Sequence, residues 1–271
     1  MKKLTLILSL VMIAGACISA PRKARRRLLL AAGSDVPAYP TNGLVLWLDG
    51  IWNAGVNTTD ANATNWVDLS GSGNNATGYN MAGTGGGYST VYNGYVYTNP
   101  ASYHEVTGLP ASGIIGGNDV TIEVCYKAFG STGNSQGPLS YQPSNKGVVN
   151  SHSVSIGYYP DFTYTYAAHV NYRVNYQEVK KTVCWTHTSS DGAEKLYIGG
   201  VERVSDSYAI LNFQAINYLW IGGAWRFHSM TNGDRDLNGY VQSVRVYNRV
   251  LTPAEVAQNA QIDTDRFASF D

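Results

Sequence analysis

The stretch that most constrains the fold is the closing one, residues 237–256. On both sides of its middle, apolar and polar residues alternate with a period of two, which is the pattern of a half-buried β-strand. The alternation changes phase near Gln242–Ser243. A phase change of this kind predicts one extra residue in the strand, a β-bulge, which lets the strand curve with its sheet.

A helix is predicted directly after this strand. Thr252 is a good N-cap, Pro253 suits the first helical position, and Glu255 stands three residues after the threonine as in a capping box. The sequence therefore predicts a short helix of about two turns that ends near Ala260.

Upstream of this segment, short runs of strand-like sequence follow one another with turns between them. The chain is rich in Gly (29) and Tyr (20) and only 14% of it is charged, a composition typical of many short strands joined by tight turns. The first run is apolar on both faces and is expected to be central in its sheet. The predicted strands span residues 43–49, 94–97, 103–106, 119–129, 181–189, 194–198, 202–206 and 218–222.

The longest alternating run is Phe162–Tyr176, which has aromatic and apolar residues at its even positions and polar ones at its odd positions. It predicts one long strand or a hairpin that preserves this parity. Residues 81–94 are expected to be a surface loop. Many strands with one helix at the end predict an all-β fold, a two-sheet antiparallel sandwich without a second domain.

The N-terminal region differs in composition from the rest. Residues 1–20 predict a signal peptide or membrane segment, with a lipoprotein-like box ending at Cys17, and residues 21–41 form a basic linker. The basic run at 22–27 conflicts with export, because positive charges tend to stay in the cytoplasm. The expectation is an extracellular or cell-surface protein, and the alternative is a virion-associated one.

The domain predicted at residues 42–271 is acidic. Residues 1–27 hold seven Lys and Arg and no acid, which leaves 12 basic and 19 acidic residues and a net charge of −7 for residues 28–271. Such a domain repels phosphate backbones, so nucleic acid is not an expected partner. Cys125 and Cys184 lie in separate predicted strands and could form a disulfide or remain free thiols.

Six segments in this order resemble the laminin-G-like, or concanavalin A-like lectin/glucanase, jelly roll of bacterial and phage surface proteins, over about residues 43–262. The resemblance implies two curved sheets packed face to face, with ligands on the concave sheet or at its rim loops. The fold hosts lectins, hydrolases and adhesion modules, so it does not by itself imply one function. The segments span residues 43–49, 68–77, 120–127, 182–188, 195–202 with 219–223, and 238–251.

Catalysis is not expected from the acidic residues. A retaining glycosidase needs two carboxylates about 5–5.5 Å apart, which two positions on one face of a strand can supply. Glu123 is the one acid of the segment 120–127, and the pair Asp234 and Asp236 falls in a predicted turn. The chain is therefore predicted not to be an enzyme, with a divergent glycoside hydrolase as the third choice.

Calcium is the one cofactor that the sequence suggests, because Asp and Asn in loops supply the oxygen ligands that it prefers. Relatives with the jelly roll often hold calcium at a rim. The alternative is that Asp68 and Asn74 make side-chain to backbone hydrogen bonds that shape a turn. The candidate ligands are Asp49, Asp68, Asn74, Asn75, Asp234 and Asp236.

Carbohydrate binding is the leading functional hypothesis. Sugars stack on aromatic rings, and their hydroxyls form hydrogen bonds with polar side chains. Trp47, Trp66, Trp185 and Trp220 are expected in the core. The candidate sugar contacts lie in predicted loops or on the polar side of the long alternating run: Trp52, His169, Asn171, Arg173, Trp225, Arg226 and His228. The prediction is a non-catalytic, lectin-like domain whose partners are glycans or a cell-surface or particle protein, and the alternative is a structural or adhesion module that binds protein.

Overall fold

The structure is a computed structural model that describes residues 36–81, 86–97, 102–107, 109, 119–129, 136–143, 154–159, 162–166, 171–172, 181–207, 216–222 and 237–267. The chain divides into two compact units, Met1–Ala38 and Tyr39–Asp271. Everything below concerns the second unit.

The second unit contains two antiparallel sheets, so the predicted all-β sandwich is confirmed. The first sheet has eight strands, with β1 (Leu44–Asp49) attached to β15 outside the order β13-β12-β11-β6-β15-β4-β3, and the second has seven in the order β10-β9-β8-β7-β14-β5-β2. The remaining strands of the first sheet are β3 (Gly86–Ser89), β4 (Gly94–Tyr97), β6 (Val120–Ala128), β11 (Lys181–His187), β12 (Ala193–Ile198), β13 (Val201–Ser207) and β15 (Gly239–Tyr247). Those of the second are β2 (Ala76–Tyr79), β5 (Tyr103–Thr107), β7 (Gln136–Pro143), β8 (Val154–Tyr159), β9 (Phe162–Tyr166), β10 (Asn171–Tyr172) and β14 (Ile216–Ile221).

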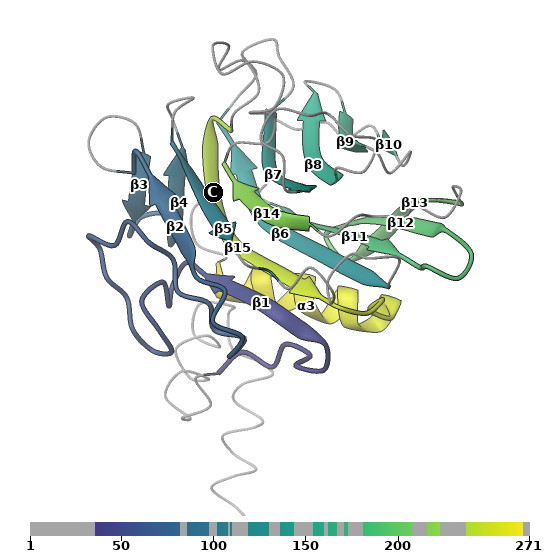
Figure 1. Cartoon of the computed structure of the whole chain (residues 1–271), viewed down its shortest axis with the longest axis horizontal. Coiled ribbons are helices and arrows are strands. Elements are labelled where there is room, and N and C mark those ends of the chain that lie inside the picture. Colours follow the sequence, from purple (N-terminus) through teal and green to yellow (C-terminus); the bar gives the residue numbers. More distant parts are fainter. Residues whose placement is uncertain are drawn as a thin grey trace, which may run out of the picture. The chain divides into compact units, whose positions relative to one another are not determined.

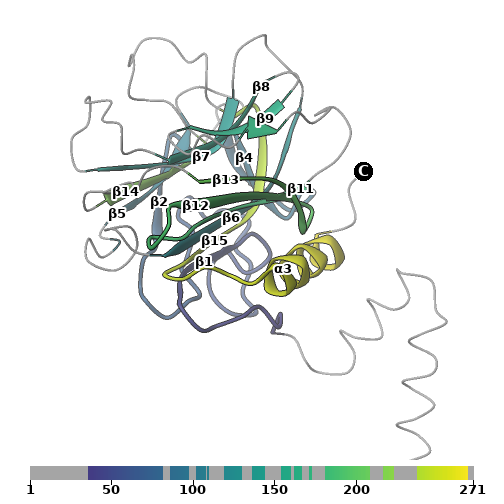
Figure 2. The ribbon, with the colours of Figure 1, turned by 90° about the vertical axis from the view of Figure 1, so that its right-hand side faces the viewer.

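Three layers are visible in side view. The helix α3 (Pro253–Arg266) lies against the outer face of the eight-stranded sheet, and the seven-stranded sheet covers the opposite face (Figures 1 and 2). Val256 of the helix packs with Tyr247, Tyr197 and Cys184 of the sheet. One sheet face is therefore covered by a helix, while the outer face of the other sheet lies on the far side of the molecule.

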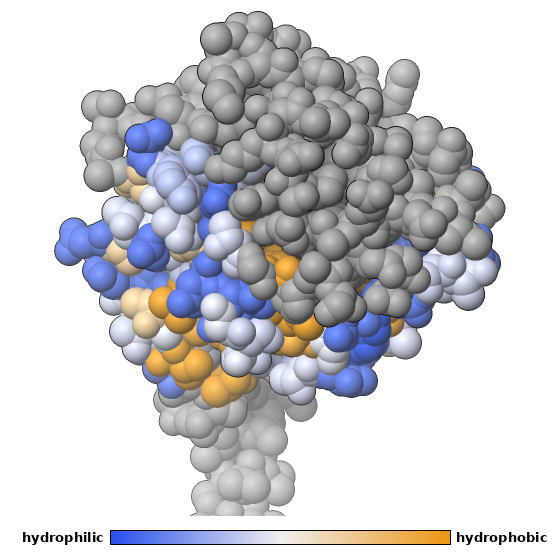
Figure 3. Space-filling model, viewed as in Figure 1, coloured by the Kyte–Doolittle hydropathy of each residue, from blue (hydrophilic) through white to orange (hydrophobic). Residues whose placement is uncertain are grey.

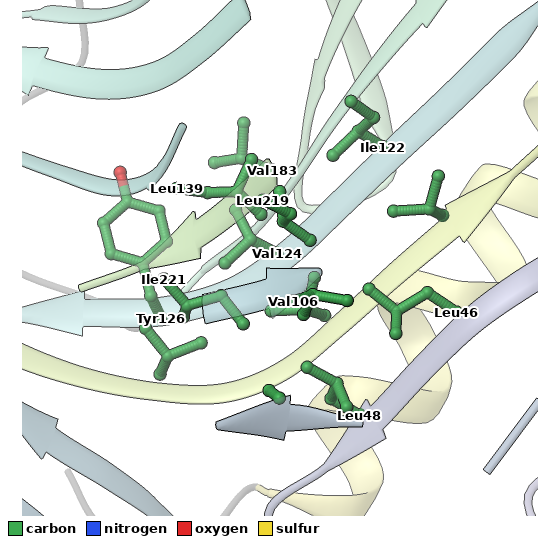
Figure 4. Packing of buried hydrophobic residues seen from close by; sticks show 14 of the residues in the cluster. Leu46, Leu48, Val106, Ile122, Val124, Tyr126, Leu139, Val183, Leu219 and Ile221 are labelled. Atoms are coloured by element: carbon green, nitrogen blue, oxygen red, sulfur yellow. The ribbon is translucent and has the colours of Figure 1, made fainter. Parts of the chain in front are cut away.

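The main core fills the space between the two sheets. Val124 and Ile122 of β6 meet Leu219 and Ile221 of β14, and Leu139 of β7 joins them (Figure 4). All of these side chains are fully buried. Burial of such apolar surface, at about 25 cal/mol per Å², is the main force that holds the two sheets together.

The bulge predicted in β15 is confirmed. Val241 pairs with Tyr126 and Ser243 pairs with the next residue back, Cys125, so Gln242 is the extra residue. The bulge changes the phase of the strand, and as a result Val241 before it and Val244 after it both lie in the core.

The capping box predicted for the helix is also confirmed. The Thr252 side chain accepts from the Glu255 backbone N–H, and the Glu255 carboxylate accepts from the Thr252 N–H. The predicted end near Ala260 is wrong, since α3 continues for another turn and a half to Arg266. Buried contacts of Asp263, described below, explain the extension, because tertiary contacts stabilise a helix beyond its propensity.

Strand β1 is not central. Among the described strands it pairs with β15, and on its other side Leu48 forms an isolated bridge with Asp68. It is apolar on both sides because Leu46 and Leu48 enter the main core, while Trp47 packs against Tyr39 and Trp52 in a separate cluster outside the sheet.

Two further expectations about strands are wrong. Residues 86–89, predicted to be part of a loop, form strand β3. The long alternating run is a hairpin of β9 and β10, but Asn171 pairs with Tyr164 and Tyr172 with Thr163. Residues that pair across an antiparallel ladder share a face of the sheet, so odd positions of β10 share a face with even positions of β9. The predicted separation of odd and even positions onto two faces is therefore not preserved. Strands β7 and β8 were not predicted.

Cys125 and Cys184 are both buried, and neither is joined in a disulfide. Their strands are neighbours, but Cys125 pairs with Thr182 and Cys184 with Glu123. The two cysteines are thus diagonal neighbours, whose Cα atoms lie about 7–8 Å apart, beyond the usual reach of a disulfide. Within the described residues, α3 is too short and too polar to be a membrane span.

Candidate functional site

One group of polar and aromatic side chains lies on the outer face of the seven-stranded sheet. Strand alternation places Val106, Leu219 and Ile221 in the core, so the alternate positions of β5 and β14 face away from it. Register then aligns Thr77, Glu105 and Trp220 in one row across three strands, and Tyr79 beside Tyr103 in the next row. These five residues are called the β2–β5–β14 face: Thr77, Tyr79, Tyr103, Glu105 and Trp220.

A carboxylate and an indole form the floor of this face. The Trp220 ring N–H donates to Glu105 Oε2 over 2.7 Å. Both side chains are only 5% exposed, so the bond is shielded from water and fixes the orientation of the ring. Trp220 was expected in the core, but it lies on the opposite side of the sheet from the core residues Leu219 and Ile221.

A pair of tyrosines lies beside this floor. The rings of Tyr79 and Tyr103 are stacked with centroids 4.8 Å apart and planes within 10° of parallel. Tyr79 is 40% exposed, and Phe129, at 43%, is the other exposed aromatic residue among the side chains that the structure describes. The stack holds an aromatic ring in a fixed orientation at the surface, where it can receive the apolar side of a ligand.

The other acid considered for catalysis, Glu123, has a structural role. Its side chain is fully buried under α3, and its Oε2 accepts from Arg245 Nε and Asn259 Nδ2, each over 2.8 Å. Burial raises the pKa of Glu123, against the opposing effect of the Arg245 guanidinium. Glu123 therefore stabilises the packing of α3 on the sheet.

The same arginine is held from the other side by the helix. Arg245 donates to both oxygens of Asp263, over 2.8 and 2.6 Å, in the bidentate geometry that gives the strongest pairs. The guanidinium also lies 4.3 Å above the ring of Tyr39, whose hydroxyl donates to Asp263 over 2.7 Å. Burial, and then Asp263, raise the pKa of Tyr39.

The predicted calcium ligands near residue 68 make hydrogen bonds within and beside the turn. Asp68 Oδ1 accepts from the backbone N–H groups of Trp47 and Ser70, and Oδ2 accepts from the Ser70 hydroxyl and the Asn74 N–H. Asn75 Oδ1 accepts from the Asp68 N–H. These bonds match the alternative given above, in which the side chains shape the turn.

Asp49, another predicted ligand, is paired with a cation. Its carboxylate accepts from Arg266 over 2.8 and 3.0 Å and from the N–H groups of Ile51 and Trp52. In the described part of the chain, no three His, Cys, Asp or Glu side chains come close enough together to hold a metal ion.

Among the predicted sugar contacts, Trp52 is buried, although it was expected to be accessible in a loop. It is only 6% exposed, because it packs against Trp47 and lies under the Arg266 guanidinium at 4.2 Å. Asn171 lies in β10 opposite Tyr164. Outside the described residues fall His169, Arg173, Trp225, Arg226 and His228, as do the predicted metal ligands Asp234 and Asp236.

Sequence reasoning missed Tyr79, Tyr103 and Glu105. The alternation within one strand could have indicated two of them. In Tyr103-His-Glu-Val-Thr107, Tyr103 and Glu105 lie on one face of the strand and Val106 lies on the other. Tyr79 lies at the end of a short strand that ends in a loop, where periodicity carries no information.

Solved structures with the same fold include two kinds of protein that are several hundred residues long. A sialidase of Trypanosoma rangeli in complex with sialic acid matches with a TM-score of 0.61 and 16% identity, over 86% of this chain and 35% of the sialidase. Botulinum neurotoxin type C, whose uptake into cells depends upon interaction with two ganglioside molecules, matches with a TM-score of 0.57 and 15% identity, over 82% of this chain and 51% of the toxin chain. The chain thus spans about a third to a half of these proteins, and at such identities the likeness shows the fold alone.

The sequence of the chain was also compared with curated proteins and with models of protein families. None of the curated proteins compared with the chain is similar enough to match it. The model of the concanavalin A-like lectin/glucanases superfamily matches residues 105–257, more than half of the chain. This segment runs from β5 of the candidate site to the first residues of α3, and includes the bulged strand β15. The chain belongs to the concanavalin A-like lectin/glucanases superfamily.

Proposed function

We propose that this protein is a non-catalytic carbohydrate-binding domain of a surface or particle-associated protein, and that it binds glycans on the β2–β5–β14 face. The observation that carries the proposal is the exposed ring of Tyr79, stacked on Tyr103 in the row next to Glu105 and Trp220. Pyranose rings have one apolar side that stacks on aromatic rings, and their hydroxyls donate hydrogen bonds to carboxylates.

The comparisons support this proposal in a general way. The sialidase structure holds sialic acid, and the toxin interacts with gangliosides, so proteins with this fold include glycan binders. Their identity to this chain is low, and the fold also hosts other functions. The support therefore concerns the class of ligand and not the sugar.

A non-catalytic role is favoured by the acids of the site. Glycoside hydrolysis by the common mechanism needs two carboxylates on either side of the scissile bond. The β2–β5–β14 face contributes one, Glu105, and the other strand acid considered, Glu123, is buried on the far side of the eight-stranded sheet and paired with Arg245.

A second candidate, an adhesion module that binds protein, is favoured by a different surface. Phe129, which follows β6 on the other sheet, is 43% exposed and packs against Tyr92 and Tyr240 with centroids 5.5 and 5.7 Å away. Exposed aromatic residues of this kind are enriched at protein interfaces.

The two candidates can be separated by matched substitutions. Tyr79→Ala and Phe129→Ala each remove one exposed aromatic ring, from opposite sheets. If glycans bind on the β2–β5–β14 face, Tyr79→Ala weakens binding on a glycan array about tenfold, while Phe129→Ala binds as the parent does. Unchanged binding in Tyr79→Ala, or no binding of any glycan by the parent, would reject the proposal. Melting temperatures of both variants serve as the folding control.

Secretion is proposed on the sequence of the first 20 residues, and calcium binding on Asp234 and Asp236. Mass spectrometry of the mature N-terminus tests the first, since an exported chain that loses its leader is shorter at this end. A rise in melting temperature at millimolar calcium, lost in the double variant Asp234→Asn and Asp236→Asn, tests the second.

A further inference from the structure

We propose that Asn62 is an acceptor for N-linked glycosylation. The inference goes beyond the proposed function, because it concerns a glycan that is attached covalently to the protein and not one that the protein binds. The acceptor of this modification is the asparagine of an Asn-x-Ser/Thr motif, and the attached glycan is a bulky, soluble group at the surface of a secreted protein. Asn62 begins such a motif, Asn62-Ala-Thr64.

Motifs of this kind are confined to one part of the chain. Three of the 22 asparagines have Ser or Thr two positions later without Pro between, and all three are exposed: Asn57, Asn62 and Asn75. The described asparagines that are buried do not begin a motif: Asn53, Asn74 and Asn259. The motifs therefore occur where the folded protein has room for a glycan.

The three motifs lie between β1 and β2, in residues 50–77, which the structure describes without a gap. This segment lies on the left of Figure 1, where Figure 3 shows hydrophilic residues at the surface. All the side chains that surround the motifs within the segment are thus known, and the three sites can be compared on their contacts.

A tight turn presents Asn62 at the surface. The Ala63 N–H donates to the Asp60 carbonyl over 3.3 Å, and the Asn62 N–H donates to Asp60 Oδ1 over 2.8 Å, as in a β-turn that an Asp side chain stabilises. Asn62 and Thr64 are both exposed. Within the described part of the chain, no hydrogen bond engages the side chain of either residue. The amide and the hydroxyl that define the motif are therefore available to an enzyme.

The other two motifs are engaged by the fold. The Thr59 hydroxyl, which belongs to the motif of Asn57, donates to the Ile51 carbonyl. Asn75 Oδ1 accepts from the Asp68 N–H over 2.9 Å, and the rest of its motif enters strand β2. Modification of either site in the folded protein requires these bonds to break first, whereas the third motif needs no such change.

The reaction needs a sugar donor and a transferase. The donor is an oligosaccharide joined to a lipid through a diphosphate, and the enzyme is an oligosaccharyltransferase that the chain meets on export. The Asn62 side-chain nitrogen forms a bond to C1 of the first sugar, and the bond from C1 to the diphosphate oxygen breaks. The lipid diphosphate leaves, and the amide proton passes to a base of the transferase. Modification in the cell thus rests on the secretion proposed above.

The direct test uses the folded full chain, a purified oligosaccharyltransferase and a lipid-linked oligosaccharide of known mass. An unstructured peptide with an Asn-Ala-Thr motif, added to the same reaction, shows that the enzyme is active. Intact-mass spectrometry is expected to show one added glycan, and peptide mapping is expected to place it on Asn62. No glycan on the chain while the peptide is modified, or a glycan elsewhere in place of Asn62, would overturn the inference.

Matched variants identify the acceptor. Asn62→Gln is expected to abolish the mass increase, and Thr64→Val, which keeps the shape of the side chain but loses the hydroxyl, is expected to reduce it severalfold. The control is Asn57→Gly, which removes another motif at a residue whose φ of 56° suits glycine; it should be modified as the parent is. A full mass increase in Asn62→Gln would overturn the assignment. Melting temperatures of the variants report folding.

A comparison with peptides separates the sequence from the fold. Three synthetic peptides, each with one of the motifs, have no hydrogen bonds from the folded protein and should be modified at rates that differ little. In the folded chain Asn62 should react severalfold faster than Asn57 and Asn75. Equal rates at the three sites of the folded chain would show that the fold does not select Asn62. These measurements do not involve the β2–β5–β14 face, so their failure leaves the proposed function standing.

Discussion

His104 shows how one side chain can make the stability of the whole core depend on pH. It is fully buried between the two sheets, with its ring against Tyr95 and Trp66 at centroid distances of 4.4 and 5.8 Å. The Tyr97 hydroxyl lies 2.8 Å from its Nδ1. Burial lowers the pKa of His104 to about 3, against an opposing effect of the Thr64 backbone.

We expect acid to destabilise the protein through His104. Below about pH 6.5 the unfolded chain binds a proton at this residue, while the folded protein does so only near pH 3. The free energy of unfolding should therefore fall as pH decreases across this window, by at most about 1.4 kcal/mol per pH unit from this residue. Urea titrations of the parent and His104→Gln between pH 7 and 4 measure the difference in slope. Parallel curves would contradict the assignment.

Asp68 makes a separate prediction about the turn that follows β1. Its two oxygens accept four hydrogen bonds, so Asp68→Ala leaves several partly buried donors without acceptors and should cost about 2–4 kcal/mol. Because these oxygens are engaged with the protein itself, millimolar calcium should change the melting temperatures of the variant and the parent by the same amount. A calcium effect that disappears in Asp68→Ala would identify Asp68 as a ligand.

At the scale of elements, Arg245 connects α3 to the eight-stranded sheet by buried ion pairs. This side chain is fully buried and pairs with Glu123 of β6 and Asp263 of α3. Buried pairs gain little over apolar packing, but removing one partner is costly, since it leaves charges in a medium that solvates them poorly. The network fixes the position of the helix more than it adds to the total stability.

We expect Arg245→Met to destabilise the protein by about 3–5 kcal/mol, because Glu123 and Asp263 are left buried without their cation. The matched control is Arg249→Met, which breaks the pair of Arg249 with Glu255; both are about a quarter exposed, so the loss should be at most about 1 kcal/mol. Guanidinium denaturation measures both. Equal losses in the two variants would show that the buried network has no special role.

The elements that the sequence predicted correctly are those determined by local chemistry. The bulge at Gln242 and the capping box at Thr252 follow from neighbouring residues, and both are found. The end of α3 and the position of β1 depend on Asp263 and Trp47 contacting distant residues. Periodicity cannot report such contacts, and it gave the wrong result in both places.

The candidate site illustrates the same limit at the scale of the whole molecule. Tyr79, Glu105 and Trp220 come from three strands that are far apart in the sequence, and only the sheet register brings them together. Trp52 shows the reverse case, a loop residue that distant packing buries under Arg266. The fold class could be predicted because strand patterns recur along the whole chain, whereas the face could not.

The N-terminal boundary of the folded domain is the last feature at this scale. The sequence placed it at residue 42, but Tyr39 contacts the helix and the sheet together: its hydroxyl donates to Asp263, its ring lies under Arg245, and it meets Trp47 edge-on at 5.4 Å. Tyr39 is only 4% exposed. The contacts of this tyrosine belong to the network that holds α3, so residues 39–41 are part of the domain.

A chain of residues 39–271 is therefore expected to fold on its own and to melt within about 2 °C of the full chain, whereas residues 42–271 should melt about 5–10 °C lower, since 1 kcal/mol corresponds to about 2–4 °C at this size. Tyr39→Phe in the longer chain keeps the ring over which Arg245 lies and loses the bond to Asp263, so an intermediate loss of about 1 kcal/mol is expected. Glycan binding should be equal in both chains, because Tyr39 lies on the helix side of the eight-stranded sheet and the β2–β5–β14 face on the other sheet. Calorimetry and glycan titration on the same samples measure both effects, and equal melting temperatures for the two chains would place the boundary back at residue 42.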